Sequence, residues 1–296
     1  MNEEKGFSKT SINWFPGHMA KAKRELKENL KLVDLVAEIV DSRIPISSRN
    51  PDFFSLYENK PKILVLNKTD LVDAKYVKQW INFYEKNNID CVSFSIRNSK
   101  SASYFISKIT NMMEPKLKAW KSKGMIGRKI RIMVTGIPNT GKSAFINKLA
   151  GNSKVKVENR PGVTRKTQWV TIGKSIEILD TPGVLPPKIS SNDIGYNLAF
   201  TGAIKDSILD LENLAIEFIE KVKKIYPENL IKRYNLELSS IENQSAYELL
   251  NLIGKNRKML VSGGEVNTLR TSEMILEEFR SGKLGSLILE FPQTEN

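Results

Sequence analysis

The sequence lacks the features that would place a protein in a membrane or an oxidising compartment. It contains one cysteine, Cys91, which excludes an internal disulfide and is typical of a reducing compartment. No apolar run approaches the roughly 18 residues needed to span a bilayer. The N-terminus carries Glu3 and Glu4 and no apolar core, so neither a secretory signal nor a transit peptide is indicated. We therefore expect a soluble cytoplasmic protein.

Acidic residues are too few to balance the basic ones. The 296 residues include 46 Lys and Arg against 33 Asp and Glu, a formal net charge of +13. Residues 1–189 have 34 basic and 17 acidic residues, whereas residues 190–296 have 12 and 16. This imbalance favours a polyanionic partner, such as nucleic acid, for the first part of the chain. A merely soluble, lysine-rich protein from a genome of biased composition is the alternative that charge leaves open.

A glycine-rich loop lies between a predicted strand and a predicted helix. Residues 129–135 are rich in branched apolar side chains, and residues 143–150 have apolar residues at helical spacing. Between them, Gly136-Ile-Pro-Asn-Thr-Gly-Lys-Ser143 completes the pattern G-x-x-x-x-G-K-[ST] of a phosphate-binding P-loop. Lys142 can reach the β- and γ-phosphates, and the Ser143 hydroxyl can hold Mg²⁺. A structural glycine turn is the alternative, which the strand–loop–helix context disfavours. The nucleotide contacts expected in this loop are Asn139, Thr140, Gly141, Lys142, Ser143 and Ala144.

A second pattern predicts which base is bound. The predicted buried strand at residues 62–66 ends in Asn67-Lys-Thr-Asp70, which matches the guanine-reading motif N-K-x-D. The carboxylate of Asp70 can accept hydrogen bonds from guanine N1–H and from the exocyclic amine, an arrangement that adenine does not offer. A site built around such a partner rejects the wrong base strongly. With Asn67 and Lys68, this motif therefore favours GTP over ATP.

Ser95 follows the next predicted strand, residues 91–94, where related GTPases have Ser-Ala-Lys in contact with the guanine oxygen. Ser95 fits this motif, whereas Ile96 and Arg97 depart from it. Only Ser95 is therefore assigned to the nucleotide.

Two segments after the P-loop are candidates for sensing the γ-phosphate. Thr164 is a candidate for the switch threonine that completes Mg²⁺ coordination. Asp180-Thr-Pro-Gly183 matches the motif D-x-x-G, in which Asp180 would hold Mg²⁺ through water and the Gly183 N–H would meet the γ-phosphate. Hydrolysis would break both γ-phosphate contacts, so the two segments are expected to loosen together.

The order of the motifs differs from that of an ordinary small GTPase, because the base-reading motifs precede the phosphate-binding ones. Opening a compact domain at one loop and joining its termini would leave the site unchanged in space. Three further segments are Trp14-Phe-Pro-Gly-His-Met19, Asp41-Ser-Arg-Ile-Pro45 and Leu198-Ala-Phe-Thr-Gly-Ala-Ile-Lys205. With them, the sequence resembles the circularly permuted ribosome-biogenesis GTPases of the RbgA/YlqF type over essentially the whole chain.

The resemblance implies an α/β fold with two domains. We expect a circularly permuted P-loop GTPase domain over residues 1–189, with a doubly wound, mostly parallel sheet and a basic N-terminal helix. Helical spacing from Asn192 onward predicts an α-helical domain over residues 190–296. Any RNA contact by this acidic domain would use a local basic face, for which Lys255, Arg257 and Lys258 are the best cluster, and a plain stabilising appendage is the alternative. The resemblance further implies a monomer whose partner is the precursor of the large (50S) ribosomal subunit and its rRNA.

The glutamine that orients the attacking water in many GTPases is missing, because Val184 follows D-x-x-G. Asn139 resembles the asparagine that helps bind K⁺ in related GTPases, where the ion supplies positive charge near the transition state. His18, the only histidine, could orient water, although a structural role is the alternative. With Lys142 and Thr164, these are the candidate catalytic residues, and we expect slow turnover that the ribosomal particle accelerates.

Two other functions stay open on the sequence alone. One is a GTPase acting on another RNA-bound target, such as the small subunit or tRNA modification. The other is an RNA-binding scaffold in which the nucleotide is only structural.

Overall fold

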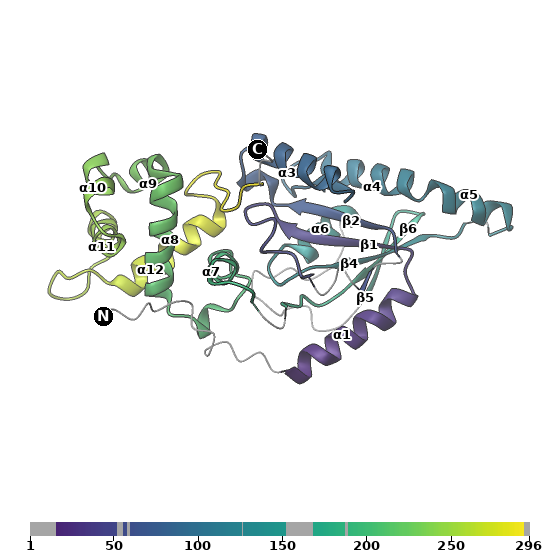
Figure 1. The fold of residues 1–296 in the computed structure, drawn as a ribbon, viewed down its shortest axis with the longest axis horizontal. Coiled ribbons are helices and arrows are strands. Elements are labelled where there is room, and N and C mark those ends of the chain that lie inside the picture. Colours follow the sequence, from purple (N-terminus) through teal and green to yellow (C-terminus); the bar gives the residue numbers. More distant parts are fainter. Residues whose placement is uncertain are drawn as a thin grey trace. The chain divides into compact units, whose positions relative to one another are not determined.

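The computed structural model describes residues 16–51, 56–57, 60–125, 127–151, 168–186 and 189–292. Within them the chain forms two compact units (Figure 1). We call residues 13–188 with 288–296 the sheet unit, and residues 189–287 the helical unit. No helix in the described part of the chain is long and apolar enough to cross a membrane.

The sheet unit is built on six strands in the order β3-β2-β1-β4-β6-β5. Five of them pair in parallel and β5 pairs antiparallel to β6, so the expected mostly parallel sheet is confirmed. The bounds are β1 Leu35–Asp41, β2 Lys62–Asn67, β3 Cys91–Ser93, β4 Ile130–Thr135, β5 Gln168–Ile172 and β6 Ile176–Asp180. The chain adds β2 and β3 on one side of β1 and then returns to add β4 on the other side. Parallel sheets bind ligands at the carboxyl ends of the strands where the order reverses in this way.

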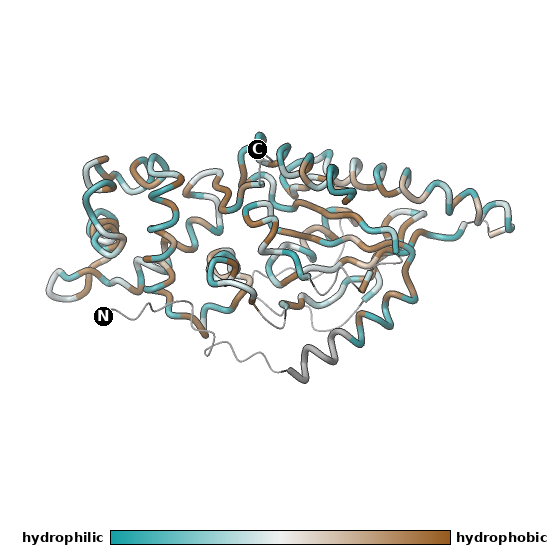
Figure 2. The backbone as a smooth tube through the Cα atoms, viewed as in Figure 1, coloured by the Kyte–Doolittle hydropathy of each residue, from teal (hydrophilic) through white to brown (hydrophobic). Residues whose placement is uncertain are grey.

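Helices cover both faces of this sheet, which explains why the central strands β1 and β2 are buried and apolar along most of their length (Figure 2). On one face, Leu26 and Leu30 of α1 pack with Val36 of β1. On the other face, Ala37 of β1 belongs to a core that includes Phe145 of α6. The helices are α1 Pro16–Lys31, α3 Ala74–Lys86, α4 Ser101–Met112, α5 Glu114–Ser122 and α6 Lys142–Ala150, with a 3₁₀ turn at Thr69–Leu71.

The helical unit is built from amphipathic helices around a core that contains Phe200, Phe218 and Phe279. Its helices are α7 Asn192–Phe200, α8 Leu211–Ile225, α9 Pro227–Tyr234, α10 Leu238–Asn243, α11 Ala246–Asn256 and α12 Thr268–Ser281, with a 3₁₀ turn at Asp206–Ile208. Ser245 and Glu248 form a complete capping box at the start of α11, which shows how the sequence sets that boundary.

The last described residues do not follow the domain division predicted from the sequence. Helical spacing predicts a helical domain that reaches residue 296, whereas residues 288–292 pack in the sheet unit. They do so because the Leu289 N–H donates to the carbonyl of Arg43 at 2.8 Å, and the indole N–H of Trp80 donates to the carbonyl of Glu290 at 3.1 Å. The chain therefore leaves the sheet unit near Lys188 and re-enters it at Ile288.

Candidate nucleotide-binding site

The P-loop follows β4 and runs into the first turn of α6, with two glycines at positions where a side chain would not fit. Gly136 has φ +146°, and a Cβ there would lie 2.4 Å from the carbonyl oxygen of Ile39. Gly141 has φ +90°, and a Cβ there would lie 2.5 Å from Nδ2 of Asn67. Both residues therefore have to be glycine for the loop to lie this close to β1 and to the end of β2.

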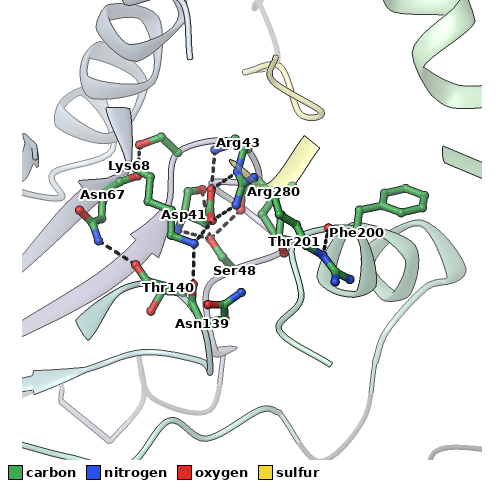
Figure 3. A network of polar contacts seen from close by, with 12 residues as sticks. Asp41, Arg43, Ser48, Asn67, Lys68, Asn139, Thr140, Phe200, Thr201 and Arg280 are labelled. Atoms are coloured by element: carbon green, nitrogen blue, oxygen red, sulfur yellow. Dashed lines mark hydrogen bonds and ion pairs between the residues drawn. The ribbon is translucent and has the colours of Figure 1, made fainter. Parts of the chain in front are cut away.

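The N-K-x-D segment and the P-loop meet directly, although they are far apart in the sequence (Figure 3). Nδ2 of Asn67, at the end of β2, donates to the carbonyl of Thr140 at 2.8 Å. Nζ of Lys68 donates to the carbonyl of Asn139 at 2.6 Å. Oδ1 of Asn67 is buried and has no hydrogen-bond partner among the residues that the structure describes. A buried acceptor without a partner at this position is available to a ligand.

Asp70 is oriented by the segment that follows β3. The Ser95 hydroxyl donates to Oδ1 of Asp70 at 2.6 Å, and Nε of Arg97 lies 3.3 Å from Oδ2. The backbone N–H of Arg97 donates to the Ser95 hydroxyl at 3.1 Å. Arg97, which departs from the Ser-Ala-Lys motif, thus contacts the carboxylate of the N-K-x-D segment. No sequence pattern indicates this contact, because only the fold brings the two segments together.

Lys142 and Asp180 form a buried pair of opposite charge beside the P-loop. Nζ of Lys142 donates to the carbonyl of Ile137 at 2.7 Å. Burial lowers the pKa of Lys142 to about 8, although the charge of Asp180 opposes this. Burial likewise raises the pKa of Asp180 to about 6 against the opposing charge of Lys142. Burial thus disfavours the charged form of both groups, and pKa values perturbed in this way are common at functional sites.

Both carboxylate oxygens of Asp180, at the end of β6, are buried without a hydrogen-bond partner in the described part of the chain. A buried carboxylate is stabilised by a cation or by donors. The pair of unpartnered oxygens therefore fits a residue that faces a hydrated metal ion. Gly183, three residues after Asp180, lies against the P-loop. A Cβ there would lie 2.8 Å from Nζ of Lys142 and 2.8 Å from the Pro138 nitrogen. D-x-x-G and the P-loop are thus packed against each other.

Three further predicted residues lie on α1 and α6. Ser143 and Ala144 are in the first turn of α6, directly after Lys142. The backbone of His18 is in the first turn of α1, but its side chain lies outside the described residues. Thr164 also lies outside them.

Asp41 is not among the nucleotide contacts expected from the sequence, where it appears only in the segment Asp41-Ser-Arg-Ile-Pro45 that supports the family resemblance. Asp41 ends β1 and pairs in register with Asn67 at the end of β2. Its buried carboxylate accepts from Nε of Arg43 at 2.9 Å and from Nη2 at 2.7 Å, and Nζ of Lys68 lies 3.0 Å away (Figure 3). Burial alone would raise the pKa of Asp41, but the charges of Arg43 and Lys68 outweigh it and hold the pKa below its ordinary value. The signal available in the sequence is an acidic residue that ends an otherwise apolar strand, next to the strand that ends in N-K-x-D.

A known protein family matches the middle part of this chain. A family model described as "50S ribosome-binding GTPase" matches residues 131–252. This match begins in β4 and contains the P-loop and D-x-x-G, whereas N-K-x-D lies before it, as circular permutation requires.

Full-length relatives and solved structures match nearly the whole chain. Ribosome biogenesis GTPase A of Bacillus cereus is 43% identical over 95% of this chain and 94% of its own. Its counterpart from Bacillus licheniformis is 44% identical over 95% and 99%. The crystal structure of GNP-bound YlqF from T. maritima matches 93% of this chain and 100% of its own, with a TM-score of 0.64 and 26% identity. The GDP-bound structure of that protein has a TM-score of 0.60. The chain is therefore a GTPase and belongs to the ribosome biogenesis GTPase A family.

Proposed function

We propose that this GTPase is an assembly factor for the large (50S) ribosomal subunit, and that its nucleotide state controls binding to and release from the precursor particle and its rRNA. The family model's description and the relatives' names support a ribosomal partner. The observation that carries the proposal is a basic surface on α5 and the segment that leads from it into β4. We further infer that the protein acts as a monomer in the cytoplasm, where it meets ribosome precursors.

This α5 surface has seven basic residues and no acidic residue between Pro115 and Arg131. Its members are Lys116, Lys118, Lys121, Lys123, Arg128, Lys129 and Arg131. Figure 1 shows α5 at the end of the sheet opposite to the arrowheads of β1 and β2, and Figure 2 shows its tip as hydrophilic. Because the nucleotide motifs follow the carboxyl ends of the strands, RNA can bind the α5 surface without covering them.

The α5 surface is held in place by one buried carboxylate and two tryptophans. Asp34 accepts from Nζ of Lys116 at 2.7 Å and lies 3.6 Å from Nη2 of Arg128. The guanidinium of Arg128 lies 4.2 Å from the ring centre of Trp120. That of Arg131 lies 5.2 Å from the ring centre of Trp169, which is 43% exposed. Ordered cations beside an exposed aromatic ring suit a nucleic-acid backbone and an unstacked base.

Neutralising exposed lysines of the α5 surface should weaken RNA binding. In a variant with Lys118→Gln, Lys121→Gln and Lys123→Gln, we expect affinity for the large-subunit precursor to fall about tenfold near physiological salt. The salt dependence of binding should also become shallower, by about one unit of slope for each phosphate that the variant no longer contacts. Co-sedimentation across a salt series measures both. The matched control replaces Lys75, Lys78 and Lys86, exposed lysines of α3, by glutamine. If the control lost as much affinity, the effect would come from net charge, and the α5 surface would not be a specific RNA-binding surface.

The nucleotide state supplies the sharper test of the proposed partner. Separated ribosomal subunits are sedimented with the protein in GDP or in a non-hydrolysable GTP analogue. We expect the protein to bind the large-subunit precursor in one nucleotide state and to be released in the other. Binding to the small subunit would favour a different RNA-bound target, and binding that ignores the nucleotide would favour a scaffold.

We infer that Ser143, Thr164 and Asp180 hold Mg²⁺, which would neutralise charge on the β- and γ-phosphates when bound. The unpartnered oxygens of Asp180 support this assignment. Lys142 would hold the β- and γ-phosphates, and the N–H of Gly183 would meet the γ-phosphate. On the base side, Asn67, Lys68, Asp70 and Ser95 would enclose guanine, with Thr140, Gly141 and Ala144 completing the loop around the phosphates.

We also infer that water activation depends on His18 and on K⁺ bound with the help of Asn139. Asn139 has φ +60°, a conformation that glycine adopts freely. Asn139→Gly therefore removes the side chain without adding backbone strain. If Asn139 helps bind K⁺, the ratio of GTPase rates in KCl and NaCl should fall towards one in this variant. A ratio equal to that of the unaltered protein would show that Asn139 does not help bind K⁺.

If His18 takes part in water activation, His18→Ala should lose the stimulation of GTP turnover by the ribosomal particle and keep its affinity for GDP.

A further inference from the structure

The last described residues, 288–292, form an extended segment that we call the tail. On one side, the N–H of Leu289 donates to the carbonyl of Arg43. On the other side, the carbonyl of Glu290 accepts from the indole N–H of Trp80, and the ring of Phe291 meets that of Tyr76 edge-on with 5.2 Å between centroids. The tail is thus fixed between α3 and the loop of residues 42–50, which we call the β1 loop.

The side chain of Glu290 makes the most specific contact between the tail and the β1 loop. Its carboxylate accepts from the backbone N–H of Ile46 at 2.6 Å and from that of Ser47 at 3.1 Å. It also accepts from the Ser47 hydroxyl. Hydrogen bonds to an ionised acceptor are about twice as strong as those between neutral groups. Glu290 therefore fixes the backbone of the β1 loop at residues 46–47.

The β1 loop in turn fixes Asp41. The hydroxyl of Ser48, the residue after Ser47, accepts from the N–H of Asp41 at 3.0 Å and donates to the carbonyl of Ile44 at 2.7 Å. The side chain of Arg43, in the same loop, holds both oxygens of the Asp41 carboxylate.

Asp41 connects this loop to the guanine-reading motif. Its Oδ2 lies 3.0 Å from Nζ of Lys68, and Nζ of Lys68 donates to the P-loop carbonyl of Asn139 (Figure 3). A continuous series of polar contacts therefore runs from the tail through the β1 loop and Asp41 to both parts of the nucleotide site.

We propose that Glu290 is a positioning residue for the guanine nucleotide. By fixing the β1 loop, it holds Asp41 against Lys68, and through Lys68 it holds the N-K-x-D segment against the P-loop. The helical unit is consequently joined to nucleotide-contacting elements at both of its ends, by the segment after D-x-x-G and by the tail. This inference concerns nucleotide affinity and does not depend on which ribosomal particle is bound.

Replacing Glu290 should accelerate nucleotide release from the full-length protein. In Glu290→Ala, we expect a fluorescent GDP analogue to dissociate about fivefold faster, within the roughly two- to thirtyfold range of residues that act through such networks. Glu290→Gln should be intermediate, because its amide keeps one acceptor oxygen. The rise in melting temperature that GDP produces should shrink in parallel, since it depends on GDP affinity.

Two controls separate positioning from a general effect on stability. Phe291→Ala removes the ring contact with Tyr76 but keeps the carboxylate, so GDP release should change less than about twofold even if the nucleotide-free protein melts earlier. In a Lys68→Met background, Glu290→Ala should have little further effect on release, because residues in one network are not additive.

Other results would overturn the proposal. Glu290→Ala could lower the melting temperature of the nucleotide-free and GDP-bound protein equally, with GDP release unchanged. Glu290 would then only stabilise the fold. Fully additive effects of Glu290→Ala and Lys68→Met would show that Glu290 does not act through Lys68.

Discussion

Asp70→Asn should lower the affinity for GDP about a thousandfold and raise the affinity for xanthosine diphosphate. A carboxylate accepts from guanine N1–H and from the exocyclic amine, whereas an amide presents a donor at one of these positions. A site built around hydrogen-bonded partners discriminates by factors of about 10⁴ or more when a partner is missing. We expect a smaller loss of about a thousandfold, because the oxygen of the introduced amide still accepts one of the two hydrogen bonds. Xanthine has a carbonyl where guanine has the amine and can therefore accept from the amide.

The surroundings of Asp70 favour one orientation of the introduced amide. The Ser95 hydroxyl donates to Oδ1 of Asp70, so the oxygen of the new amide would be retained at that position and its nitrogen placed at Oδ2. Among the residues that the structure describes, Arg97, whose side chain is 70% exposed, is the one that loses an acceptor there. The fold should tolerate the change, because exposed ion pairs contribute about 0–1 kcal/mol.

Competition by GDP, xanthosine diphosphate and ADP against a fluorescent guanine nucleotide measures this switch. Arg97→Ala is the matched control, since it removes the ion pair and leaves the carboxylate in place. It should change GDP affinity by less than about fivefold. If Asp70→Asn bound GDP within about threefold of the unaltered protein, Asp70 would not be the group that reads the base.

The parts of the site that the sequence predicts are those encoded in contiguous motifs. The P-loop is recognisable because Gly136, Gly141 and Lys142 have fixed spacing within one strand–loop–helix segment. The sheet is predictable because strands buried on both faces are continuous apolar runs. Each of these signals is local in the chain, so no knowledge of tertiary structure is needed.

The contacts that could not be predicted from the sequence join residues that are far apart in the chain. Glu290 contacts Ile46 across 244 positions, and no local pattern distinguishes it from other acidic residues near the C-terminus. Arg97 departs from a motif, yet the fold places its guanidinium on Asp70. The predicted domain boundary at residue 190 rests on helical spacing. That spacing contains no information about a non-helical tail that packs in the sheet unit.

Asp41→Ala should destabilise the protein strongly, because it removes the carboxylate that pairs with a buried guanidinium. The side chains of Asp41 and Arg43 are only 2% and 1% exposed, and that of Lys68 is 22% exposed. Removing one member of a buried ion pair costs about 3–5 kcal/mol, much of it from the charge left behind. Chemical denaturation of the nucleotide-free protein measures the loss, and GDP affinity should fall with it because Lys68 loses an anchor.

Glu177→Ala is the matched control, since Glu177 also pairs with two cations but at the surface. It lies 3.0 Å from Lys129 and 3.1 Å from Arg131, whose side chains are 33% and 48% exposed. Water solvates those cations when the carboxylate is removed, so the expected loss is below about 1 kcal/mol. Similar losses in the two variants would contradict the conclusion that burial makes the Asp41 pair important.

The pH dependence of the Asp41→Ala deficit provides an independent check. The charges of Arg43 and Lys68 hold the pKa of Asp41 below its ordinary value of 3.8, despite the opposing effect of burial. A carboxyl group whose pKa is lowered by folding stabilises the protein at pH values above its unfolded pKa, and that contribution is lost as the pH falls towards the folded pKa. The difference in unfolding free energy between the unaltered protein and Asp41→Ala should therefore be constant from about pH 6 to 8 and shrink below about pH 4. A difference that stayed constant down to about pH 3 would mean that the ionised carboxylate is not what stabilises the end of β1.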